Sequence, residues 1–227
     1  MRRESWYMAS VLLLVATVAS AQGRGMEISG WAGWTYSDGV SGQAVTAGDG
    51  NIYNRVDPQD SYSYGFSIAF LARQDVEIGF PWSRQESTLE ISGTTTREIG
   101  DLAVHNYHGY AAWSYGRRGS RVKPYFLFGM GVTDPGAVRF EFPAGTPREI
   151  DGDSRFSFTL GTGVKLYSAG PLGARLGIRF TPTYVKSDAS GYWCDPFWGC
   201  YVVGDPQYAN QWEFSGGLLL RLGGRRR

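Results

Sequence analysis

Charged side chains occupy alternate positions in segments that otherwise consist of glycine, small polar and apolar residues. The set comprises Glu27, Glu77, Lys165, Arg175, Arg179, Glu213 and Arg221, with Arg155 as a further member. On a β-strand such positions share one face with the glycine and hydroxyl residues between the apolar ones. Acids and bases gathered on one enclosed face could form an ion pathway or could pair with one another, because buried charges need partners.

The segment from Gly173 to Tyr184 shows the two faces most clearly. One set of alternate positions is apolar throughout: Ala174, Leu176, Ile178, Phe180, Pro182 and Tyr184. The other set contains Gly173, Arg175, Gly177, Arg179, Thr181 and Thr183. Glycine weakens a water-facing strand, but glycine beside a few long charges suits the crowded interior of a narrow barrel whose outer face contacts lipid.

Eight segments share this alternation of apolar and polar positions. They are residues 27–36, 63–73, 76–84, 104–115, 122–133, 155–167, 173–184 and 211–222. Each has about the 9–11 residues that a tilted strand needs to cross a membrane. An even number of strands is typical of single-chain bacterial barrels. The sequence therefore predicts an all-β fold, an eight-stranded antiparallel up-and-down transmembrane β-barrel.

Short and long connections alternate strictly between these segments. The long ones, residues 37–62, 86–102, 134–154 and 187–207, contain 16 of the 21 acidic residues. Bacterial outer-membrane barrels have short periplasmic turns and long outer loops. One hypothesis is that the acidic loops meet a phosphate-rich outer leaflet through divalent cations; the alternative is that their charges only keep the loops solvated.

The two ends of the chain indicate export. Residues 1–21 combine Arg2 and Arg3, an apolar run and an Ala-Ser-Ala cleavage site, which predicts a secretory signal peptide and a mature chain that starts near Gln22. Residues 22–222 are expected to form the barrel domain, and residues 223–227 a basic periplasmic tail. The net charge of +1 does not point to a nucleic-acid partner, and no cofactor or metal is expected.

Three stretches carry a family resemblance. They are Val122-Lys-Pro-Tyr-Phe-Leu-Phe-Gly-Met-Gly-Val, Gly161-Thr-Gly-Val-Lys and Gly173-Ala-Arg-Leu-Gly-Ile-Arg-Phe. The chain resembles the small outer-membrane β-barrel domain family, which includes OmpA-like and OmpX-like eight-stranded barrels, over residues 25–222. A departure is Leu222, where family members often end on an aromatic residue.

The resemblance implies a location in the outer membrane of a Gram-negative type of cell. The expected partners are outer-membrane lipid and lipopolysaccharide, the barrel-assembly machinery and an extracellular ligand of unknown identity. The expected role is structural or surface interaction rather than catalysis.

Eight strands leave a barrel interior, or lumen, just wide enough for side chains, so paired charges are favoured over an ion pathway. Because the last strands adjoin the first in a closed barrel, we expect Arg179 or Arg175 near Glu213, and Arg221 near Glu27.

Two further groups of residues could do chemistry. Cys194 and Cys200 are expected to form a disulfide, since the chain is exported and has two cysteines. His105 and His108 could serve a lipid-modifying enzyme if Ser87 and a carboxylate of Glu86 or Asp101 approached them across strands. His105 and His108 could equally be polar residues at a membrane rim.

A different kind of barrel would reverse the two faces. A secreted lipocalin-like protein would turn its aromatic face inward around a ligand. The charges and glycines on the opposite face, and the alternating loop lengths, speak against that alternative.

Overall fold

The protein is all-β throughout the part of the chain that the computed structural model describes. That part covers residues 25–46, 51–73, 75–117, 119–140, 148–150, 152–185, 193–195, 199–201 and 207–223. The eight long strands are β1 (Met26–Asp38), β4 (Ser61–Leu71), β5 (Val76–Gly93), β6 (Thr96–Ser114), β7 (Val122–Pro135), β10 (Arg155–Tyr167), β11 (Leu172–Val185) and β14 (Gln207–Leu222). Among these residues no helix is long and apolar enough to span a membrane.

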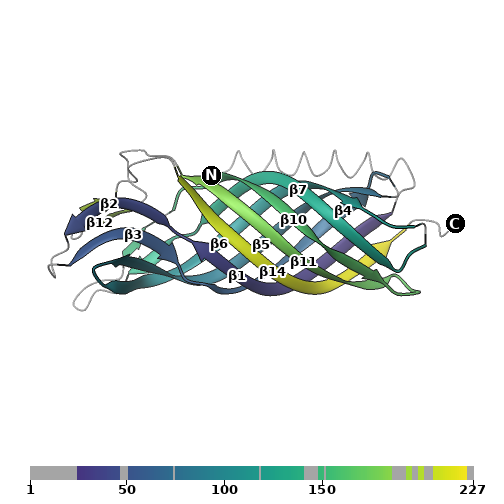
Figure 1. The fold of residues 1–227 in the computed structure, drawn as a ribbon, viewed down its shortest axis with the longest axis horizontal. Helices are drawn as coiled ribbons and strands as arrows, with labels where there is room; N and C mark the ends of the chain where they lie inside the picture. The colour runs from purple at the N-terminus through teal and green to yellow at the C-terminus, as the bar shows by residue number, and fades with distance from the viewer. Residues whose placement is uncertain are drawn as a thin grey trace.

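The eight long strands close into a single barrel (Figure 1). Their order is β5-β4-β1-β14-β11-β10-β7-β6, and β6 pairs back onto β5. Every pair is antiparallel, and each strand lies beside the long strands that precede and follow it in the chain. The predicted eight-stranded up-and-down barrel is confirmed.

The apolar side chains of these strands face outward. Exposed large hydrophobic residues occur on all eight strands, among them Trp34, Phe66, Ile78, Trp113, Phe128, Phe156, Leu176 and Leu218. Along β7 the outward residues from Val122 to Val132 are apolar, and at ~3.3 Å per residue and ~40° tilt they span roughly 25 Å. That height matches the apolar band of outer-membrane barrels. The aromatic face is therefore not turned inward, which overturns the lipocalin-like alternative.

The two ends of the barrel differ. One end, the turn end, has the short connections; between β6 and β7, Gly116 and Gly119 adopt φ values of 133° and 80°, which few residues other than glycine tolerate. The opposite end, the hairpin end, has three additional pairs: β2 (Val40–Thr46) with β3 (Ile52–Pro58), β8 (Val138–Phe140) with β9 (Arg148–Ile150), and β12 (Trp193–Asp195) with β13 (Gly199–Tyr201). Figure 1 shows β2, β3 and β12 at the end opposite the C-terminus.

Two strands are longer than the sequence pattern suggested. We expected residues 86–102 to form a loop, but β5 continues to Gly93 and β6 begins at Thr96. The reason is a change in polarity along the strands. In this extension the inward residues Leu89, Ile91 and Leu102 are apolar and buried. Above the apolar band the outer face meets water, so apolar residues move to the inside and the pattern expected for lipid contact ends.

The β2–β3 hairpin is joined to the extended β5. Strand β3 pairs with β5, with Val56 opposite Ile91. Arg55 forms ion pairs with Asp38 at 2.6 Å and Asp57 at 2.7 Å, and the Asp57 carboxylate accepts a hydrogen bond from the backbone N–H of Gly39. The hydrogen bond to Asp57 is the main cause that raises the pKa of the Arg55 guanidinium.

Candidate functional site

A buried lysine crosses the lumen near the turn end. Lys165 on β10 lies 2.5 Å from Glu27 Oε1 on β1 and 2.6 Å from Glu77 Oε2 on β5. We call these three residues the lysine cluster. Each side chain is at most 5% exposed. Strand β10 is adjacent to neither β1 nor β5 in the sheet. The lysine cluster therefore connects strands on opposite sides of the barrel across the lumen.

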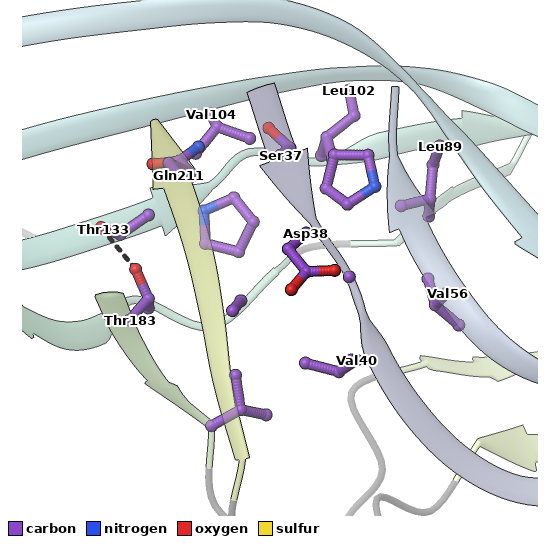
Figure 2. A pocket seen from close by; sticks show the side chains of 15 residues that line it. Ser37, Asp38, Val40, Val56, Leu89, Leu102, Val104, Thr133, Thr183 and Gln211 are labelled. Carbon is purple, nitrogen blue, oxygen red and sulfur yellow. Dashed lines mark hydrogen bonds between the residues drawn. The ribbon is translucent and has the colours of Figure 1, made fainter. Parts of the chain in front are cut away.

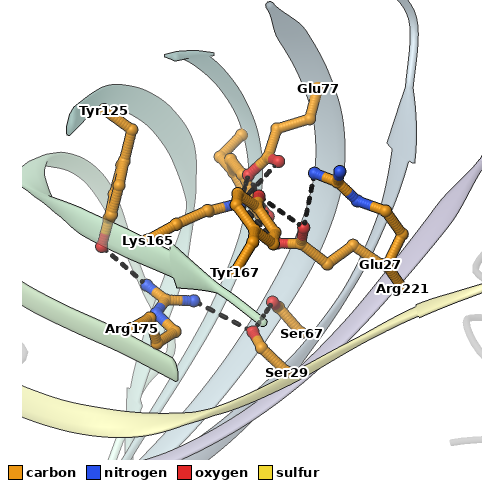
Figure 3. Close-up of polar contacts among 10 residues, drawn as sticks. Glu27, Ser29, Ser67, Glu77, Tyr125, Lys165, Tyr167, Arg175 and Arg221 are labelled. Atoms are coloured by element: carbon orange, nitrogen blue, oxygen red, sulfur yellow. Dashed lines mark hydrogen bonds and ion pairs between the residues drawn. The ribbon is translucent and has the colours of Figure 1, made fainter. Parts of the chain in front are cut away.

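Additional polar groups form hydrogen bonds and an ion pair with the two carboxylates of the lysine cluster (Figure 3). The Tyr110 hydroxyl donates to Glu77 at 3.2 Å, and the Tyr167 hydroxyl donates to Glu27 at 3.0 Å. Arg221 lies 3.7 Å from Glu27, and its guanidinium lies over the Tyr167 ring. Buried charges are tolerated when they are paired and hydrogen-bonded in this way.

Two arginines of β11 fill the next level of the lumen. Arg175 donates to Ser29 Oγ at 3.0 Å and to the Tyr125 hydroxyl at 3.2 Å. Arg179 pairs with Glu213 on the adjacent β14 at 2.6 Å. Both guanidiniums lie within 5 Å of the centre of the Trp31 ring system, at 4.8 and 4.9 Å.

Glycine makes room for this packing. A Cβ atom at Gly177 would lie 2.5 Å from the Tyr125 hydroxyl oxygen. Tyr125 also packs with Ala69, Tyr110, Ala112 and Leu127 in a buried cluster inside the barrel. The alternation of glycine with long charges thus produces a filled lumen at this level.

A layer of amides and hydroxyls lies closer to the hairpin end. Gln211 donates to Gln85 at 2.9 Å and accepts from Asn106 at 3.2 Å. Thr133 lies 2.6 Å from Asn106 Oδ1 and 3.1 Å from the Thr183 hydroxyl, which donates to it. These residues belong to five different strands, so the layer extends across the lumen.

Above this layer the lumen contains an apolar pocket with a cavity volume of about 80 Å³ (Figure 2). Its apolar lining comes from Val40, Val56, Pro58, Leu89, Leu102, Val104, Pro135, Val185 and Ala209. Thr133, Thr183, Gln211 and Ser37 supply polar groups, and Asp38, which pairs with Arg55, supplies a carboxylate. None of these lining residues was predicted as part of a site from the sequence. The available signal was the change of inward positions from polar to apolar, for example from Gln85 and Ser87 to Leu89 on β5.

The predicted enzyme residues do not assemble. Glu86 and His105 face outward, where His105 stacks near Trp82 and Tyr107, whereas Ser87 faces inward and donates to the Gln59 carbonyl. His108 is 1% exposed in the lumen, and its Nε2 lies 2.9 Å from Ser157 Oγ. Ser157 is fully buried, so this pair joins strands instead of presenting a nucleophile.

The remaining predicted residues lie at the edges of the described structure. Arg155 lies 3.2 Å from Asp153 at the hairpin end. Cys194 and Cys200 are paired positions of β12 and β13, which is a backbone arrangement that a disulfide can bridge. Their disulfide stays a prediction. The signal peptide and most of the basic tail fall outside the described residues.

Comparison with known proteins places this geometry among solved barrels. The outer membrane protein OprG from Pseudomonas aeruginosa matches with a TM-score of 0.64 and 9% identity, over 89% of this chain and 97% of that one. The outer membrane protein AlkL matches with a TM-score of 0.51 and 14% identity, over 90% of this chain and 93% of that one. The chain has the fold of the small outer-membrane barrels. A scan against protein-family models found no match, and a search of the curated proteins found none either.

Proposed function

We propose that this protein is a Gram-negative outer-membrane barrel with a structural or surface-interaction role, exported through a cleaved signal peptide. The outward apolar band is the observation that carries the proposal, since large hydrophobic residues such as Leu218, 70% exposed, suit lipid and not water. The filled, ion-paired lumen argues against a wide pore. Because His105 faces outward and Ser87 faces inward, these residues do not form the lipid-modifying site considered from the sequence.

The first prediction concerns solubility and gel mobility. The mature barrel should need detergent or lipid to stay dispersed, and its unheated form should migrate differently from the boiled form on a denaturing gel. The physical reason is that the closed barrel keeps its strands paired until heat separates them, while the apolar band aggregates in water. A protein that remains monodisperse without detergent, with the same mobility before and after boiling, would contradict membrane insertion.

The hairpin end would meet lipopolysaccharide or external partners. Several outward acids of β5 and β6 lie above the apolar band, and Glu98 and Asp101 are exposed. Two neighbouring acids already have closer partners within the protein: Glu86 lies near Arg84, and Glu90 accepts a hydrogen bond from Gln59. Glu98 accepts a hydrogen bond from Gln59 at only one oxygen and remains exposed. The exposed carboxylates are the ones that divalent cations could bridge to lipid phosphates.

The second prediction tests this bridging. Removing Mg²⁺ and Ca²⁺ with a chelator should weaken binding of the folded barrel to lipopolysaccharide vesicles. The double substitution Glu98→Gln, Asp101→Asn should weaken binding in the presence of the cations by about two- to thirtyfold, since exposed charge pairs each contribute ~0.2–1 kcal/mol and two are removed. Asp75→Asn, an exposed acid at the turn end, is the matched control and should have no effect. Binding that is insensitive to both the chelator and the double substitution would show that the acidic charges only solvate the hairpins.

A further inference from the structure

The inner face of the barrel changes character toward the hairpin end. Its buried polar and charged residues include Lys165, Glu213, Gln85 and Gln211. Beyond the amide layer the inward residues are instead aliphatic, including Leu89, Leu102, Val104 and Val185. This aliphatic wall surrounds the cavity of about 80 Å³.

The pocket has an apolar wall on several strands and a polar floor. Figure 2 shows Leu89 and Leu102 on one side and the hydrogen-bonded pair of Thr133 and Thr183 on the other, with Val104 beside Gln211 and Asp38 between the two sides. Sites for small molecules combine a mainly apolar lining with a few polar groups that fix orientation. For scale, an engineered aliphatic cavity of ~150 Å³ binds benzene. The pocket in this barrel suits a short aliphatic group.

The hydrogen bonds of the floor define the polar end of a ligand. Thr183 uses its single hydroxyl hydrogen to donate to Thr133. A hydroxyl oxygen can also accept hydrogen bonds, so Thr183 can accept one from a ligand. The Gln211 amide has two N–H groups, one of which donates to Gln85. A ligand hydroxyl can donate to the Thr183 oxygen and accept from the Gln211 amide, whereas an ether oxygen could only accept.

We infer that this pocket binds a small aliphatic molecule that carries one terminal hydroxyl, with the chain against Leu89, Leu102 and Val104 and the hydroxyl against Thr183. This goes beyond the proposed function, because it involves neither the apolar band nor the acidic hairpins. A failure to bind such a ligand would leave membrane insertion untouched.

The test uses the full mature barrel in lipid nanodiscs with labelled leucine and valine methyl groups. The probe is 1-propanol, which is short enough for a cavity of about 80 Å³, and its isomer ethyl methyl ether is the matched comparison without a hydroxyl hydrogen. In NMR titrations the methyl signals of Leu89, Leu102, Val104 and Val185 should shift and saturate with 1-propanol. The lipid-facing methyl groups of Leu176 and Leu218 report on simple partitioning into the bilayer and should change only gradually with concentration.

Substitutions test the apolar lining and the hydrogen bond to Thr183 separately. Ala209→Phe fills the pocket and should abolish the saturable shifts, while Ala32→Phe places the same side chain on the exposed outer face and should leave them unchanged. Thr183→Val should weaken 1-propanol binding by about fivefold, the usual effect of one neutral hydrogen bond, without changing the binding of the ether. The NMR spectra of all three variants verify that the barrel is folded.

Several outcomes would overturn the inference. Pocket methyl groups that shift only in parallel with the lipid-facing ones would show partitioning instead of binding. Equal affinities of the wild type for 1-propanol and ethyl methyl ether would contradict the assignment of the ligand hydroxyl to Thr183. Contacts between the pocket methyl groups and aromatic protons of the chain itself, in the absence of ligand, would show that the protein fills its own pocket.

Discussion

Lys165→Met is expected to lower the free energy of unfolding by about 3–5 kcal/mol, the usual cost of removing one partner from a buried ion pair. Methionine matches the lysine stem in length but supplies no positive charge. Glu27 and Glu77 would then face each other in the lumen, each at most 5% exposed, without the ammonium group that lies within 2.6 Å of both. Urea unfolding of the barrel in lipid vesicles measures the loss.

Removing the whole cluster should cost less than removing its lysine. The triple variant Lys165→Met, Glu27→Gln, Glu77→Gln leaves no uncompensated charge among the three, so most of the lost stability should return. Lys123→Met is the matched control, because Lys123 lies opposite Lys165 in the register of β7 and β10 but is only partly buried. It should cost clearly less than Lys165→Met. If the triple variant were as unstable as the single one, the lysine would act through its packing and not through its charge.

Strand alternation was enough to place charges on the inner face, but it could not assign all their partners. Arg179 and Glu213 are opposite one another on adjacent strands, so neighbourhood in the sheet brings them together. Arg221 and Glu27 are likewise register partners of β14 and β1. Lys165 instead reaches across the lumen to two strands that β10 does not pair with. Such contacts depend on the tilt and stagger of the closed barrel, which no short sequence pattern specifies.

The strand ends at the hairpin end were harder to predict because the outer face of each strand changes there from contact with lipid to contact with water. Within the apolar band an outward residue such as Trp82 meets lipid, whereas two and four residues further along β5 the outward residues are Arg84 and Glu86. A search for apolar residues on one constant face therefore stops at the membrane boundary. Continued pairing, Ser87 with Leu102 and Ile91 with Arg97, shows that the strands go on. The same inversion creates the apolar pocket.

Ile178→Arg should destabilise the barrel by about 2–4 kcal/mol, because it places a guanidinium on the lipid face near the middle of β11. Ile178 is 40% exposed on the outer wall, while its neighbours in sequence, Gly177 and Arg179, face the lumen. The adjacent residue Arg179 lies at nearly the same depth in the barrel, where its side chain points inward and pairs with Glu213. An arginine is therefore tolerated at this depth on the inner face. The expected loss of stability therefore arises because the arginine at position 178 would face lipid, and not because arginine is unfavourable in this strand.

The control is an arginine on the same outer face of β11 but at the edge of the bilayer. Leu172→Arg introduces the same charge at the first residue of β11, which is 59% exposed at the turn end, and should cost only about 0–1 kcal/mol because the side chain can reach headgroups and water. Urea unfolding in vesicles compares the two variants under identical conditions. Equal losses at positions 172 and 178 would contradict a bilayer-spanning wall, since in water an outward arginine costs little at either place.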